Sequence, residues 1–282
     1  MLRTLFFTFT LLALTNTFTN AQTARDIIDD MLDSFGELRT LEYDFYQNEQ
    51  LRKGRNEYLA HVRLQINPQK VYVKTISPDK GIEVLYRDGH LNNKALINPN
   101  GFPYVNVKLD PLSGQLMKDR HHPIFRSGFK PIERIMRKAI KRADEESVNV
   151  LTRTADDAFD GKECYKVELN DPTFGYVNYT VKSGENLCTI SDRLNIGDYM
   201  IMLQNPKISD FKDVSAGDVI RIPTSYSKRT VIWVEKDTML PIKLKMFDEK
   251  GVLYEQFEFR NMQINPSFPS NEFTENGPGY GF

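Results

Sequence analysis

Residues 58–68 read YLAHVRLQINP, and they carry the plainest structural signal in the chain. Apolar side chains alternate with polar ones from Tyr58 to Ile66, and Asn67-Pro68 then ends the run. An alternation of period two places every apolar side chain on the same face of a β-strand. We therefore predict a strand that buries one face.

The same alternation recurs on both sides of this stretch. Turn sequences such as Asp88-Gly89 and Asn98-Pro99-Asn100-Gly101 separate the runs, which predicts antiparallel strands joined by short connections. The further predicted strands are Leu41–Gln47, Val71–Ile76, Ile82–Tyr86, Leu91–Ile97, Val148–Thr152, Glu163–Leu169, Val231–Glu235, Ile242–Met246 and Leu253–Phe259.

Helical spacing replaces the alternation in two regions. Residues 24–38 place six apolar side chains on one face, with acidic residues near the favourable N-terminal end. A helical interlude begins near Asp110-Pro111 and resumes after Ser127, where the apolar face is opposed by a basic one. Because acidic residues accompany these bases, we interpret the basic face as solvated rather than as membrane-binding.

Charge excludes some classes of partner. The 282 residues contain 37 Lys and Arg against 38 Asp and Glu, a formal net charge of −1. Such a chain has no basic excess to neutralise a phosphate backbone, so neither nucleic acid nor an anionic membrane surface is an expected partner.

The first 21 residues have the pattern of an export signal. Arg3 precedes the apolar run Leu5–Leu14, and Thr19-Asn20-Ala21 ends in the small residue that a signal peptidase requires. We predict cleavage near Ala21 and a periplasmic protein that begins at Gln22. No later segment approaches the roughly twenty apolar residues of a membrane span.

Residues 179–223 break the strand pattern. Their segments YTVKSGENLCTIS (179–191), LQNP (203–206) and SAGDVIRIP (215–223) resemble the LysM carbohydrate-binding module in composition and order. The resemblance implies a βααβ unit that binds N-acetylglucosamine chains such as peptidoglycan. The alternative is an incidental βααβ insert without a ligand.

The LysM resemblance also implies where the sugar would bind. It places a shallow groove between the first turn and the loop after the second helix, with Leu187 and Ile208 giving apolar contact to the sugar. The candidate residues are Gly184, Glu185, Asn186 and Leu187 on one side and Asn205, Pro206, Lys207 and Ile208 on the other. Glu185 replaces the aspartate of most LysM modules, and Cys188 is unusual at its position.

The surrounding sequence, residues 22–178 and 224–282, resembles the lipoprotein carrier and receptor superfamily (LolA/LolB-like). The resemblance rests on FYQ (45–47), INP (66–68), VLYRDGH (84–90), the double hairpin 233–253 and NEFT (271–274). It implies an α+β fold with a strongly curved antiparallel sheet, a half-barrel wrapped around helices, and a nested βααβ module. Carriers tend to have arginine where this chain has Asn67, so acyl binding is not simply inherited.

A curved sheet leaves room for an apolar cavity on its concave side, and 18 Phe with 13 Tyr would suffice to line it. Alternation alone does not distinguish a vacant face from a packed one, so a completely filled core is the competing expectation. The two cysteines, Cys164 and Cys188, fall in different predicted units, and we expect separate buried thiols rather than a disulfide.

The sequence offers little support for an enzyme. No histidine lies near either cysteine, Glu146-Ser147 lacks the helical context of a lytic transglycosylase, and no glycine-rich phosphate loop is present. His121 and His122 are adjacent, and we expect them to point in different directions with no third metal ligand to join them.

These observations predict a non-catalytic periplasmic protein without metal or cofactor. It would bind peptidoglycan or N-acetylglucosamine oligomers through residues 179–223, and acyl chains or an envelope lipoprotein through the curved sheet. The alternatives are a structural or sensory adaptor with a filled core and, third, a cell-wall-processing enzyme.

Overall fold

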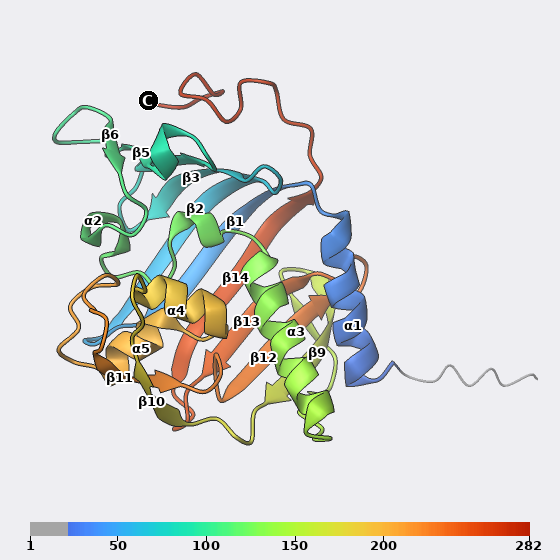
Figure 1. Ribbon diagram of the computed structural model, residues 1–282. Helices are drawn as coiled ribbons and strands as arrows, with labels where there is room; N and C mark the ends of the chain where they lie inside the picture. The colour runs from blue at the N-terminus through green and yellow to red at the C-terminus, as the bar shows by residue number, and fades with distance from the viewer. Residues whose placement is uncertain (1–21) are drawn as a thin grey trace, which may run out of the picture.

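The computed structural model describes residues 22–282, and its main feature is a large antiparallel sheet, curved but not closed, with helices across one face (Figure 1). The export signal expected in residues 1–21 lies outside this range. The predicted α+β class and the curved antiparallel sheet are confirmed. The strands are β1 (Thr40–Gln50), β2 (Arg55–Gln65), β3 (Lys70–Ser77), β4 (Glu83–Arg87), β5 (Ala95–Asn98), β6 (Val107–Leu109), β7 (Leu151–Arg153), β8 (Asp157–Phe159), β9 (Lys162–Asn170), β10 (Tyr176–Thr180), β11 (Val219–Pro223), β12 (Arg229–Glu235), β13 (Pro241–Phe247) and β14 (Leu253–Ile264).

Twelve of these strands form the main sheet, in the order β6-β5-β4-β3-β2-β1-β14-β13-β12-β9-β7, with β8 beside β9. Sequential hairpins build the half from β1 to β6, whereas in the other half β12 pairs with β9 across an excursion of the chain. The halves join where β1 pairs with β14, in a register that places Phe45 opposite Phe259. The first and last long strands of the chain are therefore neighbours at the centre of the sheet.

The helices follow the predicted periodicity, although their ends differ. They are α1 (Ala24–Ser34), α2 (Gly114–Met117), α3 (Lys130–Glu145), α4 (Leu187–Leu194) and α5 (Asp198–Gln204), with short 3-10 turns η1 (Phe35–Glu37), η2 (Leu91–Asn93) and η3 (Ile124–Arg126). Thr23 caps the N-terminus of α1 and forms a capping box with Asp26, and the helix ends before the predicted Leu38.

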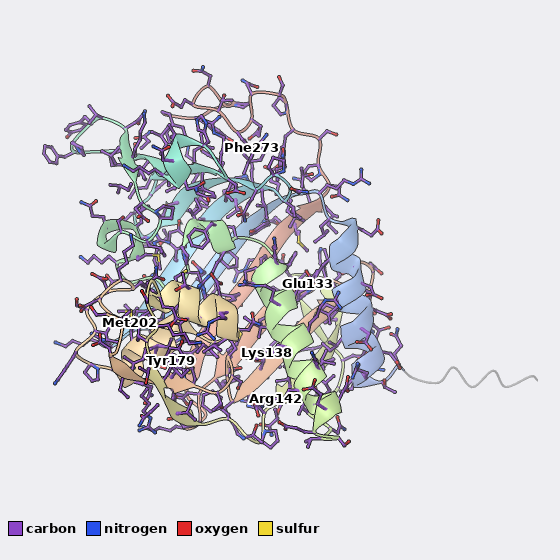
Figure 2. The ribbon with its side chains drawn as sticks, in the orientation of Figure 1. Glu133, Lys138, Arg142, Tyr179, Met202 and Phe273 are labelled. Carbon is purple, nitrogen blue, oxygen red and sulfur yellow. The ribbon has the colours of Figure 1, made fainter. Side chains whose placement is uncertain are left out.

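The main hydrophobic core lies between the concave face of the sheet and helices α1 and α3. Ile27, Ile28 and Met31 of α1 are fully buried there. On the convex face, Phe273 of the C-terminal segment packs with Tyr72 and other side chains of β3 to β5 (Figure 2). The C-terminal segment thus covers the convex face of β3 and β4, and only their other face points to the concave side.

Residues 171–228 leave the sheet and return to it between paired neighbours, because β9 and β12 pair directly, with Asn170 opposite Arg229. Within this excursion β10 and β11 form a separate two-stranded antiparallel sheet, and α4 and α5 connect them. Leu187, Ile190, Met202 and Ile222 belong to a second hydrophobic cluster inside this βααβ unit.

The βααβ unit is packed firmly onto the large sheet. Met200 of α5 is 1% exposed and belongs to the main core. Gly197 lies so close to Tyr254 of β14 that a Cβ atom there would be 3.0 Å from the tyrosine hydroxyl. Lys138 of α3 also donates to the carbonyl of Leu194 at the end of α4 (Figure 2). The nested unit therefore shares the core of the large sheet instead of standing apart from it.

Cys164 and Cys188 are both buried and unpaired, as expected for separate thiols. In residues 22–282, no helix combines the length and the hydropathy that a membrane crossing requires.

Candidate functional site

A cavity of about 800 Å³ opens on the concave side of the sheet. Its volume falls within the range of about 300–1,000 Å³ that is common for small-molecule sites. The expectation of a cavity is confirmed, and the competing expectation of a completely filled core is wrong.

The sheet contributes the apolar wall of this cavity. Alternation turns Tyr43 and Phe45 of β1, Val73 of β3 and Phe257 and Phe259 of β14 toward the same space. Because β1 and β14 are adjacent, their aromatic rings pack together, with centroids 5.6 Å apart for Phe45 and Phe257 and 5.0 Å apart for Phe45 and Phe259. These rings make a rigid apolar surface at the centre of the sheet.

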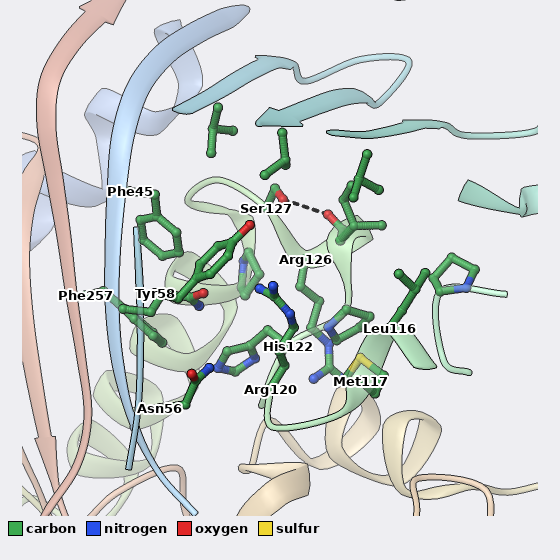
Figure 3. A pocket seen from close by; sticks show the side chains of 18 of the residues that line it. Phe45, Asn56, Tyr58, Leu116, Met117, Arg120, His122, Arg126, Ser127 and Phe257 are labelled. Atoms are coloured by element: carbon green, nitrogen blue, oxygen red, sulfur yellow. Dashed lines mark hydrogen bonds between the residues drawn. The ribbon is translucent and has the colours of Figure 1, made fainter. Parts of the chain in front are cut away.

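The segment between β6 and α3 supplies the opposite wall. It adds apolar side chains from α2, η3 and α3, namely Leu116, Met117, Ile124, Ile132 and Met136. The Ser127 hydroxyl donates to the carbonyl of Ile124 at 2.7 Å and closes the η3 turn (Figure 3).

One end of the cavity is polar. The guanidinium of Arg120 lies over the ring of Tyr58, 3.9 Å from its centroid, and Asn56 donates to the carbonyl of Asp119 at 2.7 Å. His122 and Arg126 line the same space, toward which Figure 3 shows Phe45, Tyr58 and Phe257 pointing from the sheet. The cavity therefore pairs an apolar body with cationic and hydrogen-bonding groups.

The two arginines differ in their partners. Arg126 is committed to the βααβ unit, since its Nη1 donates to Asp198 at 2.7 Å and its Nη2 donates to Ser191 at 2.8 Å. Arg120 makes no ion pair with any carboxylate among residues 22–282, although its ring contact holds it at the cavity wall. It is the charged group best placed to meet an anionic ligand.

The first set of predicted sugar-binding residues lies at the start of α4. Gly184 is exposed and has the positive φ of 78° that the turn requires. Asn186 caps α4 by accepting from the amide of Thr189, and Glu185 accepts from the Tyr179 hydroxyl at 2.6 Å. Burial opposes ionisation of the Glu185 carboxyl, but hydrogen bonds from the Tyr179 hydroxyl, the Lys182 amide and Arg193 outweigh it and lower the pKa of Glu185.

The second set follows α5. Pro206 and Lys207 are exposed, whereas the side chain of Asn205 bridges the carbonyl of Ile201 and the backbone of Arg221. The Arg52 guanidinium, from the β1–β2 turn, donates to the carbonyls of Met202, Asn205 and Ile208.

The expectation that Leu187 and Ile208 give apolar contact to a sugar is wrong. Leu187 is 0% and Ile208 7% exposed, because both pack in the core of the βααβ unit and offer no surface to a sugar. The carbonyls of Asn205 and Ile208 already accept from Arg52. The exposed or half-exposed candidates are Gly184, Glu185, Asn186, Asn205, Pro206 and Lys207.

The expectation that His121 and His122 diverge is also wrong. Both rings contact the Glu255 carboxylate, at 2.6 Å from His121 Nδ1 and 3.1 Å from His122 Nε2. The spacing of residues in the sequence did not reveal this cluster. Its two carboxylates come from remote strands, Glu255 from β14 and Glu49 from β1.

Two family models match parts of the sequence. Residues 40–178 match a family described as a protein of unknown function (DUF1571), and residues 219–276 match the MucB/RseB N-terminal domain. Neither model spans half of the chain. Neither family model is a LysM model, so the resemblance of residues 179–223 to LysM stays a prediction. No curated protein matches the sequence.

Similar solved structures include the MucA/MucB complex of Pseudomonas aeruginosa, at 12% identity and a TM-score of 0.42 over 89% of this chain and 60% of that chain. Lipoprotein LppX of Mycobacterium tuberculosis matches at 10% identity and a TM-score of 0.42, over 86% of this chain and 96% of its own. A LolA superfamily protein of Nitrosomonas europaea matches at 12% identity and a TM-score of 0.30, covering 90% and 98%. The neighbours are thus lipoprotein-sorting folds and MucB, too distant to support a shared function.

Proposed function

We propose that this protein is a periplasmic binding protein, without catalytic activity, that holds the acyl chain of a lipid or lipoprotein in the cavity of its curved sheet. The observation that carries the proposal is the cavity of about 800 Å³, with its aromatic and aliphatic walls. Residues 1–21 would direct export.

In this proposal, the polar end of the cavity binds the charged group of the ligand. It takes the place of the arginine that carriers tend to have where this chain has Asn67. An acyl chain would lie against Phe45, Phe257 and Val73, and its carboxylate or phosphate would meet Arg120. Charge-assisted hydrogen bonds to such a group contribute about 1.5–3 kcal/mol, so Arg120 would set the orientation of the chain in the cavity.

Delipidated protein should bind a long-chain fatty acid, and Arg120→Met should weaken that binding by about tenfold or more, the equivalent of losing about 1.5 kcal/mol. The same variant should bind the uncharged alcohol of equal chain length as tightly as the wild type, because methionine preserves the apolar wall. Calorimetric titration measures both affinities. The proposal fails if the wild-type protein binds no fatty acid and mass spectrometry of the purified protein finds no co-purified lipid.

Wall-sugar binding by the βααβ unit is a second proposal. What favours it is the chain order β10-α4-α5-β11 together with the exposed turns at Gly184 and Lys207. The site is narrowed to Gly184, Glu185, Asn186, Pro206 and Lys207, with peptidoglycan or N-acetylglucosamine oligomers as ligand.

The protein should then co-sediment with purified peptidoglycan, and long N-acetylglucosamine oligomers should compete better than short ones. Asn186→Asp should reduce sedimentation several-fold, because it removes the side-chain amide donor while aspartate still caps the helix. Thr180→Ser, at an exposed position of β10 that is not one of the five site residues, serves as the control. Equal sedimentation of wild type and Asn186→Asp would remove this site.

A further inference from the structure

Four metal-ligating side chains meet below the polar end of the cavity. They are Glu49 at the end of β1, His121 and His122 in the loop between α2 and η3, and Glu255 on β14, and one ligand atom of each lies within 4.8 Å of the others. Glu255 and His121 are 0% exposed and Glu49 is 1% exposed. Three segments that are remote in sequence thus bring two imidazoles and two carboxylates into one largely buried space.

The charges of this cluster are not balanced by the rest of the protein. Among residues 22–282, neither Glu49 nor Glu255 forms an ion pair with a lysine or arginine, and Glu255 pairs only with the two histidines. With neutral imidazoles the cluster carries a formal charge of −2. Buried charge of this size requires compensation, which either two protons or one divalent cation provides.

Protons and a metal would compete for the same nitrogen atoms. Burial by itself lowers the pKa of His121 and of His122, but the Glu49 and Glu255 carboxylates outweigh burial and raise both pKa values. Burial likewise opposes ionisation of Glu255, yet the two histidines hold the pKa of its carboxyl well below the ordinary value. What recommends this cluster as a cation site is its geometry, because one ligand atom of each of the four side chains lies within 4.8 Å of the others.

Neighbouring groups orient these side chains through hydrogen bonds, as the outer partners of metal ligands do in known metal sites. His121 Nε2 lies 2.7 Å from the carbonyl of Gln50, which directs Nδ1 toward Glu255. The Tyr226 hydroxyl donates to Glu255 Oε2 at 2.6 Å, and Gln47 donates to Glu49 at 3.3 Å. Burial raises the pKa of Tyr226, and Glu255 raises it further, so this hydroxyl keeps its proton as a donor.

We propose that Glu49, His121, His122 and Glu255 form a binding site for a divalent transition-metal ion, with Zn²⁺ as the best fit. Two imidazole nitrogens and two carboxylate oxygens complete a four-coordinate set of ligand types that Zn²⁺ accepts, whereas Ca²⁺ and Mg²⁺ prefer oxygen ligands throughout. In a tetrahedral site with bonds of about 2.0–2.1 Å, neighbouring ligand atoms lie roughly 3.3 Å apart, so modest side-chain rotations suffice to admit the ion.

The ion would hold together β1, β14 and the 118–123 loop. His122 and Tyr226 also line the cavity, so the site fixes the polar end of the cavity from below. A four-ligand site of this kind is structural and leaves no open position for catalysis.

The test uses the full chain, stripped of metal by a chelator and titrated with Zn²⁺ and with Co²⁺ as a spectroscopic probe. We expect binding of one ion per chain at micromolar concentration or below, visible absorption typical of tetrahedral Co²⁺, and a higher Tm with Zn²⁺. Affinity should fall as the pH falls, because protons displace the ion from the imidazoles.

His122→Gln should weaken Zn²⁺ binding by roughly 100-fold or more, since loss of even an outer partner costs 10–100-fold. The histidine side chain is 18% exposed, so the substitution is compatible with folding. His61→Gln is the matched control, because His61 also contacts two carboxylates, those of Glu42 and Asp44, but at the protein surface. This control should bind Zn²⁺ as the wild type does.

Two results would overturn the proposal. One is wild-type protein that takes up neither Zn²⁺ nor Co²⁺ in a defined ratio, which would make the cluster an imidazolium–carboxylate network. The other is binding that survives His122→Gln and is lost in His61→Gln, which would place the ion at the surface group.

Discussion

Replacing Arg126 with methionine is expected to lower the free energy of unfolding by about 3–5 kcal/mol, the cost of breaking a buried ion pair from one side. The side chain is 8% exposed and its partner Asp198 is 1% exposed, so the substitution strands a carboxylate in the interior. Ser191 and Cys188 of α4 lose the same donor. Urea unfolding followed by circular dichroism measures the loss.

Arg134→Met is the control for Arg126→Met. Arg134 also pairs with the βααβ unit, at 2.7 Å from Asp192, but its side chain is 41% exposed. An exposed pair contributes at most about 1 kcal/mol. Adding Asp198→Asn to Arg126→Met should restore much of the stability, because it removes the stranded charge. Equal losses in Arg126→Met and Arg134→Met would show that burial does not set the strength of this contact.

Val73→Trp is expected to weaken fatty-acid binding by at least about tenfold, or about 1.4 kcal/mol. Val73 lies between Val62 and Val84 in the sheet register and faces the cavity, so an indole there fills space that a ligand would need. Because the added volume enters a cavity and not a packed core, we expect little loss of stability. Calorimetric titration of delipidated protein provides the affinity.

Ile76→Trp is the matched control on the same strand. Ile76 is 40% exposed and does not line the cavity, so this variant should bind fatty acid as the wild type does. If Val73→Trp also keeps its full affinity, the ligand lies outside the cavity.

Much of the sheet was predictable from local pattern, because alternation in β1, β2 and β13 reports which face is buried. The cavity was not, since alternation does not distinguish a side chain that contacts another side chain from one that faces open space. Arg120 is not part of any helical or strand pattern in the sequence. Its place at the cavity wall depends on its contact with the ring of Tyr58, which is remote in sequence.

Long-range contacts explain the remaining differences. Ile208 is buried because Leu51 and the Arg52 guanidinium, at the tip of the β1–β2 hairpin, lie against the loop that contains it. His121 and His122 converge because β14 brings Glu255 beside β1. Neither contact follows from the residues adjacent in sequence, so reading the chain segment by segment does not reveal them.

The pairing of β1 with β14 imposes an order on folding during synthesis. A chain that emerges from its N-terminus can form the local hairpins from β1 to β6 as they appear, but β1 then keeps an unpaired edge. Its partner begins about two hundred residues later, at Leu253, and closing so long a loop is entropically costly and slow. Until then the central strand presents a free edge on which a second nascent chain can pair. Premature release from a holding chaperone should therefore produce aggregates joined through β1.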